Sequence, residues 1–381
     1  MDARTQIEDG VFLAEVRDFL ARELTPELQE AGRQTTHTYS EFHAARAWQR
    51  KLHRRGWVAP VWPVAHGGAG WTARQRLLFE HECARWDAPI LFAGGIRTIG
   101  PLLIAAGSPA QRERYLPRIL AGDDYWCQGF SETQAGSDLA ALQLAARRDG
   151  DAYVLNGSKI WTTGAHDANR MFALVRTAQK PKRQDGITFL LIDMDTPGIT
   201  VKPIISLAGD HEVNQVFFDD ARIPVTQRVG DEDEGWATAK LLMRFARSSN
   251  TTSGLVRRAL NNAQRAIAKF APGDEDIRMR KAQLECEITG LEALEIRLLT
   301  GGGEVTEVTS SLLKTLATEL HQRVSELGLE TVGLAGQPMT HGSGTGELAM
   351  RKYLNTRAAT IYSGTNETHR NLMGGALLGR L

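Results

Sequence analysis

The sequence predicts an α+β protein in which a helical part, a strand-rich part and a second helical part follow one another. Three observations support this prediction. Apolar residues recur at helical spacing in the first third, short strand-like runs fill the middle, and long helical patterns return after Gly235. Because helices and strands do not alternate, the order excludes a βαβ design and the dinucleotide-binding fold built from it.

The first domain is expected to span residues 1–122 and to be helical. Apolar residues three and four positions apart follow Phe12, and a second face of this kind runs from Phe42 to Leu52. A further helix is expected to begin after Ser108, which has the side chain of an N-cap and precedes a proline at the first helical position.

The second domain is expected to span residues 123–229 and to be built from strands. Its run AYVLNGSKIWTT contains the pair Asn156-Gly157, a strong short-range signal of a hairpin turn. The apolar runs GITFLLIDM and NQVFFDDARI are predicted to be further strands.

The third domain is expected to span residues 230–381 and to be helical again. Long helical patterns cover 236–270, 276–300 and 309–327, and a run of three glycines separates the last two. We find no internal repeat and no low-complexity tract.

Charge and composition argue against several classes of partner and site. Lys plus Arg number 45 and Asp plus Glu number 45, so the formal net charge is zero and does not indicate nucleic acid or an anionic membrane. The first residues are polar, and no apolar run approaches the ~20 residues of a membrane span. Three widely spaced cysteines fit neither a disulfide framework nor a zinc site. We expect a cytoplasmic protein without a metal site.

Five segments resemble signature segments of the acyl-CoA dehydrogenases. QGFSETQAGSD at 128–138 and KIWTTGA at 159–165 are similar to the two flavin-contacting segments of that family. SPAQRERYLPRILAGD and GWATAKLLMRFAR precede and follow the β region, and IYSGTNETHR at 361–370 is similar to the C-terminal signature. The resemblance covers nearly the whole chain and implies a helical domain, a middle β-barrel domain and a C-terminal four-helix bundle.

The resemblance also implies FAD as cofactor and an acyl-CoA thioester as substrate. In the family a hydroxyl in the first segment bonds the flavin ring near N5 and O4, and an indole in the second lies along the ring. The implied FAD contacts are Gln128, Phe130, Ser131, Gly136, Ser137, Trp161, Thr163, Glu330, Gly333, Thr365 and Glu367. The implied substrate contacts are Ser137, Arg247, Tyr362 and Gly364.

The residue that removes the substrate's alpha proton in many family members is absent. In those enzymes a glutamate directly follows the Ile-Tyr pair, and this chain has Ser363 there. Some members place the glutamate just before the CoA-side arginine, where this chain has Ala246. A serine hydroxyl does not replace a carboxylate as a general base.

Arg97, in GGIRTIGP, occupies a position where the family usually has an apolar residue lining the acyl pocket. A guanidinium facing that cavity is costly without an anion or a hydrogen-bonding partner, because it keeps its charge. Two interpretations stay open. The acyl group is acidic or polar, or the side chain turns outward or pairs with a local carboxylate.

Three functional hypotheses follow, and the sequence leaves all three open. The chain is a flavin-dependent dehydrogenase with a non-standard base, or a non-catalytic subunit of a heteromeric assembly whose other subunit supplies the glutamate, as in steroid side-chain degradation. In the third hypothesis the flavin does other chemistry, such as elimination, desulfination or oxygenation. Function resides in the site rather than in the fold.

The family resemblance implies partners and a metabolic setting as well. It implies a homodimer or homotetramer, or a heteromer with a homologous subunit, and electron-transfer flavoprotein or another electron acceptor. Fatty-acid, dicarboxylate or steroid side-chain catabolism is the expected setting.

Overall fold

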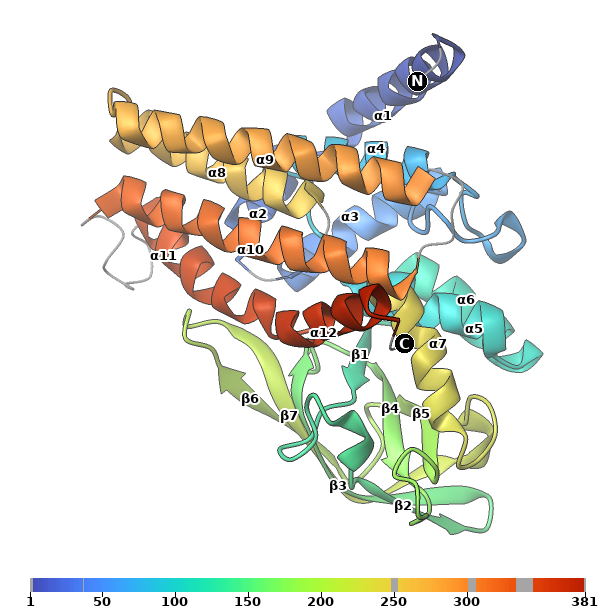
Figure 1. Cartoon of the computed structure of the whole chain (residues 1–381). Coiled ribbons are helices and arrows are strands. Elements are labelled where there is room, and N and C mark those ends of the chain that lie inside the picture. Colours follow the sequence, from blue (N-terminus) through green and yellow to red (C-terminus); the bar gives the residue numbers. More distant parts are fainter. Residues whose placement is uncertain (1–2, 37, 248–252, 301–305, 334–344, 380–381) are drawn as a thin grey trace.

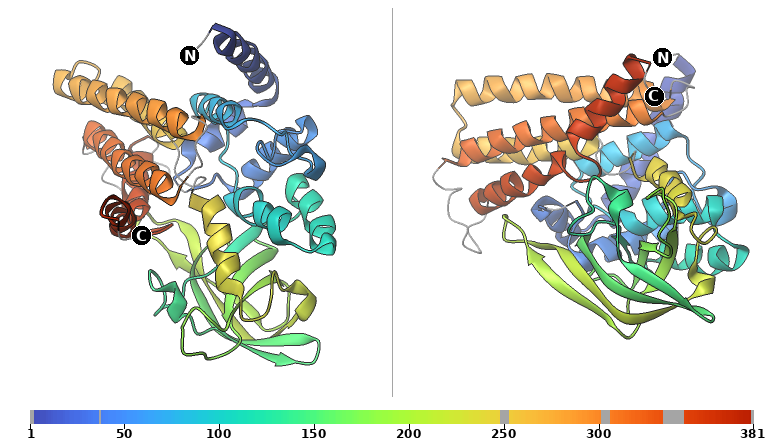
Figure 2. Two further views of the ribbon diagram at one scale, coloured as in Figure 1. Left: turned by 45° about the vertical axis from the view of Figure 1, so that its right-hand side comes forward. Right: turned by 60° about the horizontal axis from the view of Figure 1, so that its bottom comes forward.

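The computed structural model describes residues 3–36, 38–247, 253–300, 306–333 and 345–379. Helices come first, a seven-stranded sheet follows, and helices return (Figure 1). The predicted α+β order is therefore confirmed. The sheet lies on one side of the molecule and the helices cover the other, as the three views agree (Figures 1 and 2).

The N-terminal helices pack around one apolar core that continues onto one face of the sheet. The predicted start after Ser108 is confirmed, because its hydroxyl accepts from the Gln111 backbone and the Gln111 side chain bonds back to the cap. The elements are α1 (Ala3–Glu23), α2 (Pro26–Gln34), α3 (Phe42–Arg55), η1 (Val64–His66), α4 (Ala73–Arg85), η2 (Gly94–Ile99), α5 (Gly100–Ala106) and α6 (Pro109–Ala121).

The sheet is strongly curled, and its strands follow the order β1-β4-β2-β3-β7-β6, with β5 paired to β4. Most pairs are antiparallel, whereas β4 runs parallel to β1 and β2. The strands are β1 (Trp126–Gly129), β2 (Ala145–Asp149), β3 (Ala152–Thr163), β4 (Arg170–Arg176), β5 (Ile187–Asp193), β6 (Ile199–Ile205) and β7 (His211–Pro224), with short turns η3 (Leu139–Ala141) and η4 (Val225–Gln227).

The hairpin predicted at Asn156-Gly157 is wrong. Both residues lie inside β3, and the turn that joins β2 to β3 includes Gly150, whose φ is +63°. Gly157 has a φ of +138° at a shift in the register between β3 and β7. Asn156 is bonded across the strands, because its Nδ2 donates to Asp220 Oδ1 over 2.9 Å. The dipeptide that favours a turn therefore lies within a strand, opposite a β-bulge whose extra residue belongs to β7.

The C-terminal helices form the second helical layer (Figure 1). The single helix predicted over 236–270 is two helices in the described residues. The first, α7, packs on β5 and the second, α8, packs on α10. The elements are α7 (Gly235–Arg247), α8 (Ser253–Phe270), α9 (Glu275–Thr300), α10 (Glu307–Val332), α11 (Thr345–Thr356), η6 (Arg357–Thr360) and α12 (Asn366–Leu377). Among the helices in these ranges, none combines the length and apolar character that a membrane crossing requires.

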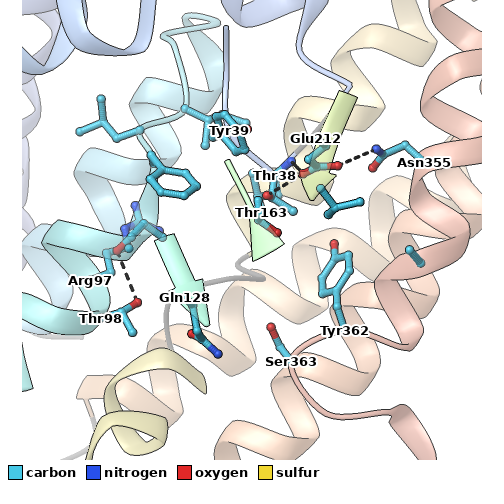
Figure 3. A pocket seen from close by; sticks show the side chains of 18 of the residues that line it. Thr38, Tyr39, Arg97, Thr98, Gln128, Thr163, Glu212, Asn355, Tyr362 and Ser363 are labelled. Carbon is cyan, nitrogen blue, oxygen red and sulfur yellow. Dashed lines mark hydrogen bonds between the residues drawn. The ribbon is translucent and has the colours of Figure 1, made fainter. Parts of the chain in front are cut away.

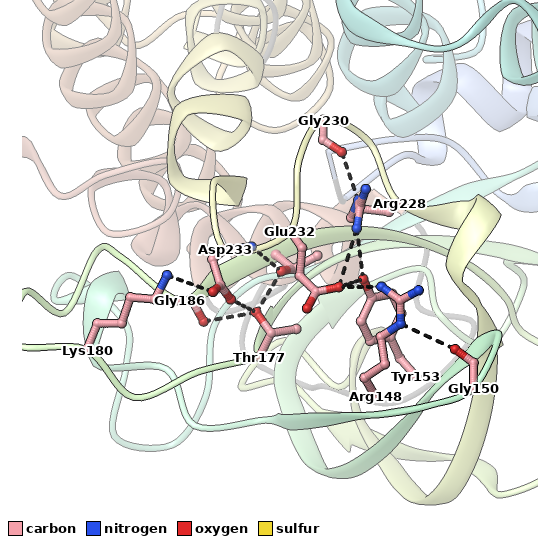
Figure 4. A network of polar contacts seen from close by, with 11 residues as sticks. Arg148, Gly150, Tyr153, Thr177, Lys180, Gly186, Arg228, Gly230, Glu232 and Asp233 are labelled. Atoms are coloured by element: carbon pink, nitrogen blue, oxygen red, sulfur yellow. Dashed lines mark hydrogen bonds and ion pairs between the residues drawn. The ribbon is translucent and has the colours of Figure 1, made fainter.

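A polar network fixes the chain where it leaves the sheet for α7 (Figure 4). Glu232 accepts a hydrogen bond from the Tyr153 hydroxyl. Asp233, with a φ of +68°, accepts from Thr177 Oγ1 over 2.6 Å and pairs with Lys180 Nζ over 2.7 Å. The direction in which α7 starts is therefore set by side chains of the sheet.

The N-terminal helices, the sheet and the C-terminal helices meet just before β7. Asp210 is almost fully buried, and its Oδ2 accepts from Thr36 Oγ1 over 3.0 Å. Its other oxygen pairs with Arg351 of α11. A buried carboxylate needs such partners because desolvation of an unpaired charge is costly. One side chain thus joins all three parts of the chain.

The close crossing of η2 over β1 generates a prediction about stability. A Cβ atom on Gly94 would lie 1.9 Å from the backbone oxygen of Trp126. Gly94→Ala is therefore expected to lower the free energy of unfolding by about 1–3 kcal/mol, measured by denaturant titration. Gly290→Ala is the matched control, because a Cβ there, on an exposed face of α9, meets no atom within 4 Å. Gly290→Ala should leave the free energy of unfolding unchanged or raise it by up to about 1 kcal/mol. If both variants lose the same amount of stability, the close contact between Gly94 and the Trp126 backbone does not limit the size of the residue at position 94.

Candidate functional site

A cavity of about 920 Å³ lies where the three parts of the chain meet (Figure 3). Both motifs of the sheet and the C-terminal signature contribute to its wall, although they are far apart in the sequence. The predicted site residues that line it are Arg97, Gln128, Phe130, Ser131, Gly136, Ser137, Trp161, Thr163, Tyr362, Ser363, Gly364 and Thr365.

The backbone of Trp161 has a conformation that a non-glycine residue rarely adopts. Its φ is +58°, in the left-handed region, and the register between β3 and β7 shifts between Lys159 and Thr162. The residue is 60% exposed and lines the cavity. Such backbone strain persists only where the surrounding structure imposes it, and it is concentrated at functional sites. The bulge therefore presents a large flat apolar surface beside the hydroxyl of Thr163.

A buried ion pair stabilises the backbone of the first motif, at residues 128–138. Lys159 is fully buried, and its Nζ lies 2.7 Å from Glu132 Oε1 and donates to the Phe130 backbone oxygen over 3.1 Å. Glu132 also accepts from the backbone N–H of Leu144 over 2.9 Å. Burial lowers the pKa of Lys159 to about 8, an effect that the Glu132 carboxylate opposes. The pair fixes the backbone on both sides of Ser131.

Glu212 is a buried carboxylate on the cavity wall that sequence reasoning missed. Its Oε1 accepts from Thr38 N over 3.2 Å and from Thr38 Oγ1 over 3.0 Å, and its Oε2 accepts from Asn355 Nδ2 over 3.0 Å (Figure 3). Like Asp210, it joins the three parts of the chain. No signal in the sequence indicated this, because its partners lie more than a hundred residues away.

Arg97 both lines the cavity and pairs with a carboxylate, so the two interpretations of this residue are compatible. Its Nη2 lies 3.1 Å from Glu80 Oε1, and 35% of the side chain remains exposed. In Figure 3 it lies on the opposite side of the cavity from Tyr362 and Glu212. Glu80 also lines the cavity, and no motif in the sequence indicated it.

The turn that carries Ser363 is anchored from two helices. Ser363 has a φ of +57° and Gly364 a φ of +86°. Lys314 of α10 donates to the Gly364 oxygen over 2.9 Å, and His369 of α12 bonds the Ser363 oxygen over 3.1 Å. Ser363, at the position where the family resemblance predicts a glutamate, therefore lies on an anchored turn of the cavity wall.

Some predicted site residues are not brought to this cavity. Glu330 pairs with Arg280 at the end of α10, and Gly333 is the C-cap of that helix. Glu367 is exposed in the first turn of α12. The side chains of Ala246 and Arg247 lie outside the described residues, so their predicted roles stay predictions.

Comparison with known proteins shows the family. Residues 8–123 match the model of the acyl-CoA dehydrogenase N-terminal domain, 127–221 match the middle domain, and 233–378 match the C-terminal domain. The chain belongs to the acyl-CoA dehydrogenase family, whose members are FAD-dependent oxidoreductases.

Individual relatives share the full length of the chain. The acyl-CoA dehydrogenase IpdE1 of Mycobacterium tuberculosis (strain ATCC 25618 / H37Rv) is 37% identical over 380 residues, which are 97% of each chain. The solved structure of the "Tcur3481-Tcur3483 steroid ACAD" matches with a TM-score of 0.84 and 26% identity over 100% of this chain and 99% of that one. The ChsE4-ChsE5 complex from Mycobacterium tuberculosis matches with a TM-score of 0.81 and 28% identity, over 98% of this chain and 97% of that one.

The buried pair behind the first motif can be tested directly. Lys159→Met leaves Glu132 as a buried carboxylate without its cation, so the free energy of unfolding should fall by about 3–5 kcal/mol in a denaturant titration. Arg222→Met is the control, because it breaks the exposed pair with Asp149 in the same sheet. This control should lower the stability far less, because water screens an exposed ion pair. Similar losses in the two variants would show that the Lys159 pair has no special structural role.

Proposed function

We propose that this chain binds FAD and oxidises an acyl-CoA thioester at the alpha and beta carbons, with a base other than the usual glutamate. One observation carries the proposal. The two motifs of the sheet and the turn at 362–364 converge on a single cavity, although no two of these three segments are neighbours in the sequence.

The cavity wall fits a flavin chemically. Trp161 offers an exposed aromatic face, and Gln128, Ser131 and Thr163 line the same cavity with hydrogen-bonding groups. A flat ring with a polar edge needs this combination of surface and donors. When bound, FAD supplies the acceptor for the hydride that leaves the substrate. The residues of this chain bind and orient the two molecules.

Uptake of FAD is the first expected result. The purified protein should be yellow or become yellow when FAD is added, and Trp161→Ala should raise the dissociation constant by roughly 3- to 10-fold because an aromatic contact is lost. Fluorescence quenching of FAD measures this constant. Phe217→Ala is the control, because Phe217 is a partly exposed aromatic of the same sheet that is not among the cavity residues. A folded protein that takes up no FAD from an excess would overturn the proposal.

Removal of the alpha proton needs a group that the two usual positions do not provide. Among the described residues, the carboxylates that line the cavity are Glu80 and Glu212. Glu80 pairs with Arg97, and both oxygens of Glu212 accept hydrogen bonds. We propose that the reaction uses a base placed differently from the family's glutamate.

Placing a glutamate at position 363 or 246 tests whether the missing base is the only difference from the family's usual reaction. Ser363→Glu should raise the rate of dehydrogenation of a simple acyl-CoA, because the carboxylate would stand on the anchored turn that faces the cavity. Ala246→Glu is the second variant, at the alternative position. Rates are measured anaerobically from the bleaching of the flavin, and Ser363→Gln is the isosteric control. If neither variant raises the rate of dehydrogenation at full FAD occupancy, the hypothesis that only the base is missing is wrong.

A heteromeric assembly is the second candidate function. Two observations favour it: both usual glutamate positions lack a carboxylate, and two similar solved structures are named for pairs of different chains, Tcur3481-Tcur3483 and ChsE4-ChsE5. In this case the chain alone binds FAD without oxidising thioesters, and it gains activity when a homologous subunit with the glutamate is added. The name "steroid ACAD" of one neighbour supports a steroid-derived acyl group for either candidate.

A further inference from the structure

Two guanidinium groups face one carboxylate at the wall of the cavity. Arg97 Nη2 lies 3.1 Å from Glu80 Oε1, and Arg76 Nη1 lies 3.9 Å from the same oxygen. The three side chains together carry one net positive charge, since two cations meet one anion. Burial favours the neutral acid, yet Arg97, Arg76 and His81 hold the pKa of Glu80 below its usual range, so it stays ionised.

The three side chains differ in their access to the cavity. Glu80 and Arg76 are 11% and 12% exposed, whereas Arg97 is 35% exposed. Arg97 and Glu80 both line the cavity, and Arg97 is the more exposed of the two. Its planar guanidinium has several N–H donors in a fixed geometry, and Nη2 donates to Glu80 Oε1 over 3.1 Å.

The surroundings of Arg97 make its charge a strong determinant of binding. The wall of the cavity includes the buried apolar side chains of Leu52, Val58, Phe79 and Ile96. In such surroundings an electrostatic contact is worth more than in water. Glu80 fixes the guanidinium in one orientation, so less conformational entropy is lost when a ligand binds.

We propose that Arg97 is a specificity-determining residue that binds an acceptor oxygen on the far part of the acyl group, so that this protein prefers thioesters bearing a second carboxylate or a ketone. This inference rests on the proposed function, because it takes the cavity to be the acyl-binding site. The net positive charge of the cluster favours the carboxylate over the ketone. Purely hydrocarbon acyl groups leave the guanidinium facing an apolar ligand and bind more weakly.

The test measures binding rather than turnover. The FAD-loaded protein is titrated by calorimetry with adipyl-CoA, 5-oxohexanoyl-CoA and hexanoyl-CoA, which have acyl chains of six carbons. The wild type should bind adipyl-CoA at least ~10-fold more tightly than hexanoyl-CoA, as expected for one charge-assisted hydrogen bond. The ketone should lie between the two. Equal affinity for all three would overturn the inference.

Three variants separate recognition from folding. Arg97→Met should abolish the preference for acceptor oxygens, with little change for hexanoyl-CoA. Arg97→Met/Glu80→Gln should do the same without leaving a buried carboxylate beside the lost cation. Arg74→Met is the matched control. Arg74 lies on α4, the helix of Glu80, and forms a part-buried ion pair with Asp9 of α1, but it is not among the cavity residues, so this variant should keep the preference. A preference retained in the double variant would overturn the inference.

The outcomes also separate this inference from the proposed function. A protein that binds FAD and all three thioesters without discrimination contradicts only the role of Arg97. A protein that takes up no FAD, or takes up FAD but no thioester, contradicts the proposed function as well.

Discussion

Two buried carboxylates near the start of β7 are the constraint on which the site depends. Asp210 bonds Thr36 and Arg351, and Glu212 bonds Thr38 and Asn355. Each carboxylate therefore finds one partner in the N-terminal part and one in α11. Because unpaired buried charge is costly, these contacts favour a single arrangement of the three parts. The cavity exists only in that arrangement, since each part supplies a portion of its wall.

The two facing walls of the cavity are built in the same way. On the sheet, Trp161 has a left-handed backbone next to the buried Lys159 ion pair, and on the helical side Ser363 has a left-handed backbone fixed by Lys314 and His369. In both places buried polar contacts hold a conformation that the residue itself disfavours. Rigid walls of this kind reduce the entropy that is lost when a ligand binds.

Two residues of the cavity depart from the pattern that the family resemblance predicts. Ser363 stands where that pattern has a carboxylate after the Ile-Tyr pair, and Arg97 stands where it has an apolar side chain. The guanidinium of Arg97 adds a cation to the cavity wall. Under the proposed function, Ser363 bears on whether the chain acts alone or with a second subunit, and Arg97 bears on which acyl groups it accepts.

The sequence by itself determined the order of the elements, the family and the two motifs of the sheet, because these depend on local periodicity and on contiguous residues. It also selected Trp161, Ser131 and Ser363, which line one cavity in the structure. It misjudged Asn156-Gly157, where pairing with Asp220 across the strands outweighed the local preference for a turn. Only the tertiary structure decided that Arg97 pairs with Glu80 and that Glu212 contacts all three parts of the chain. A buried charge pairs with whichever group lies near it in space, and local sequence patterns do not predict which distant segments come close together.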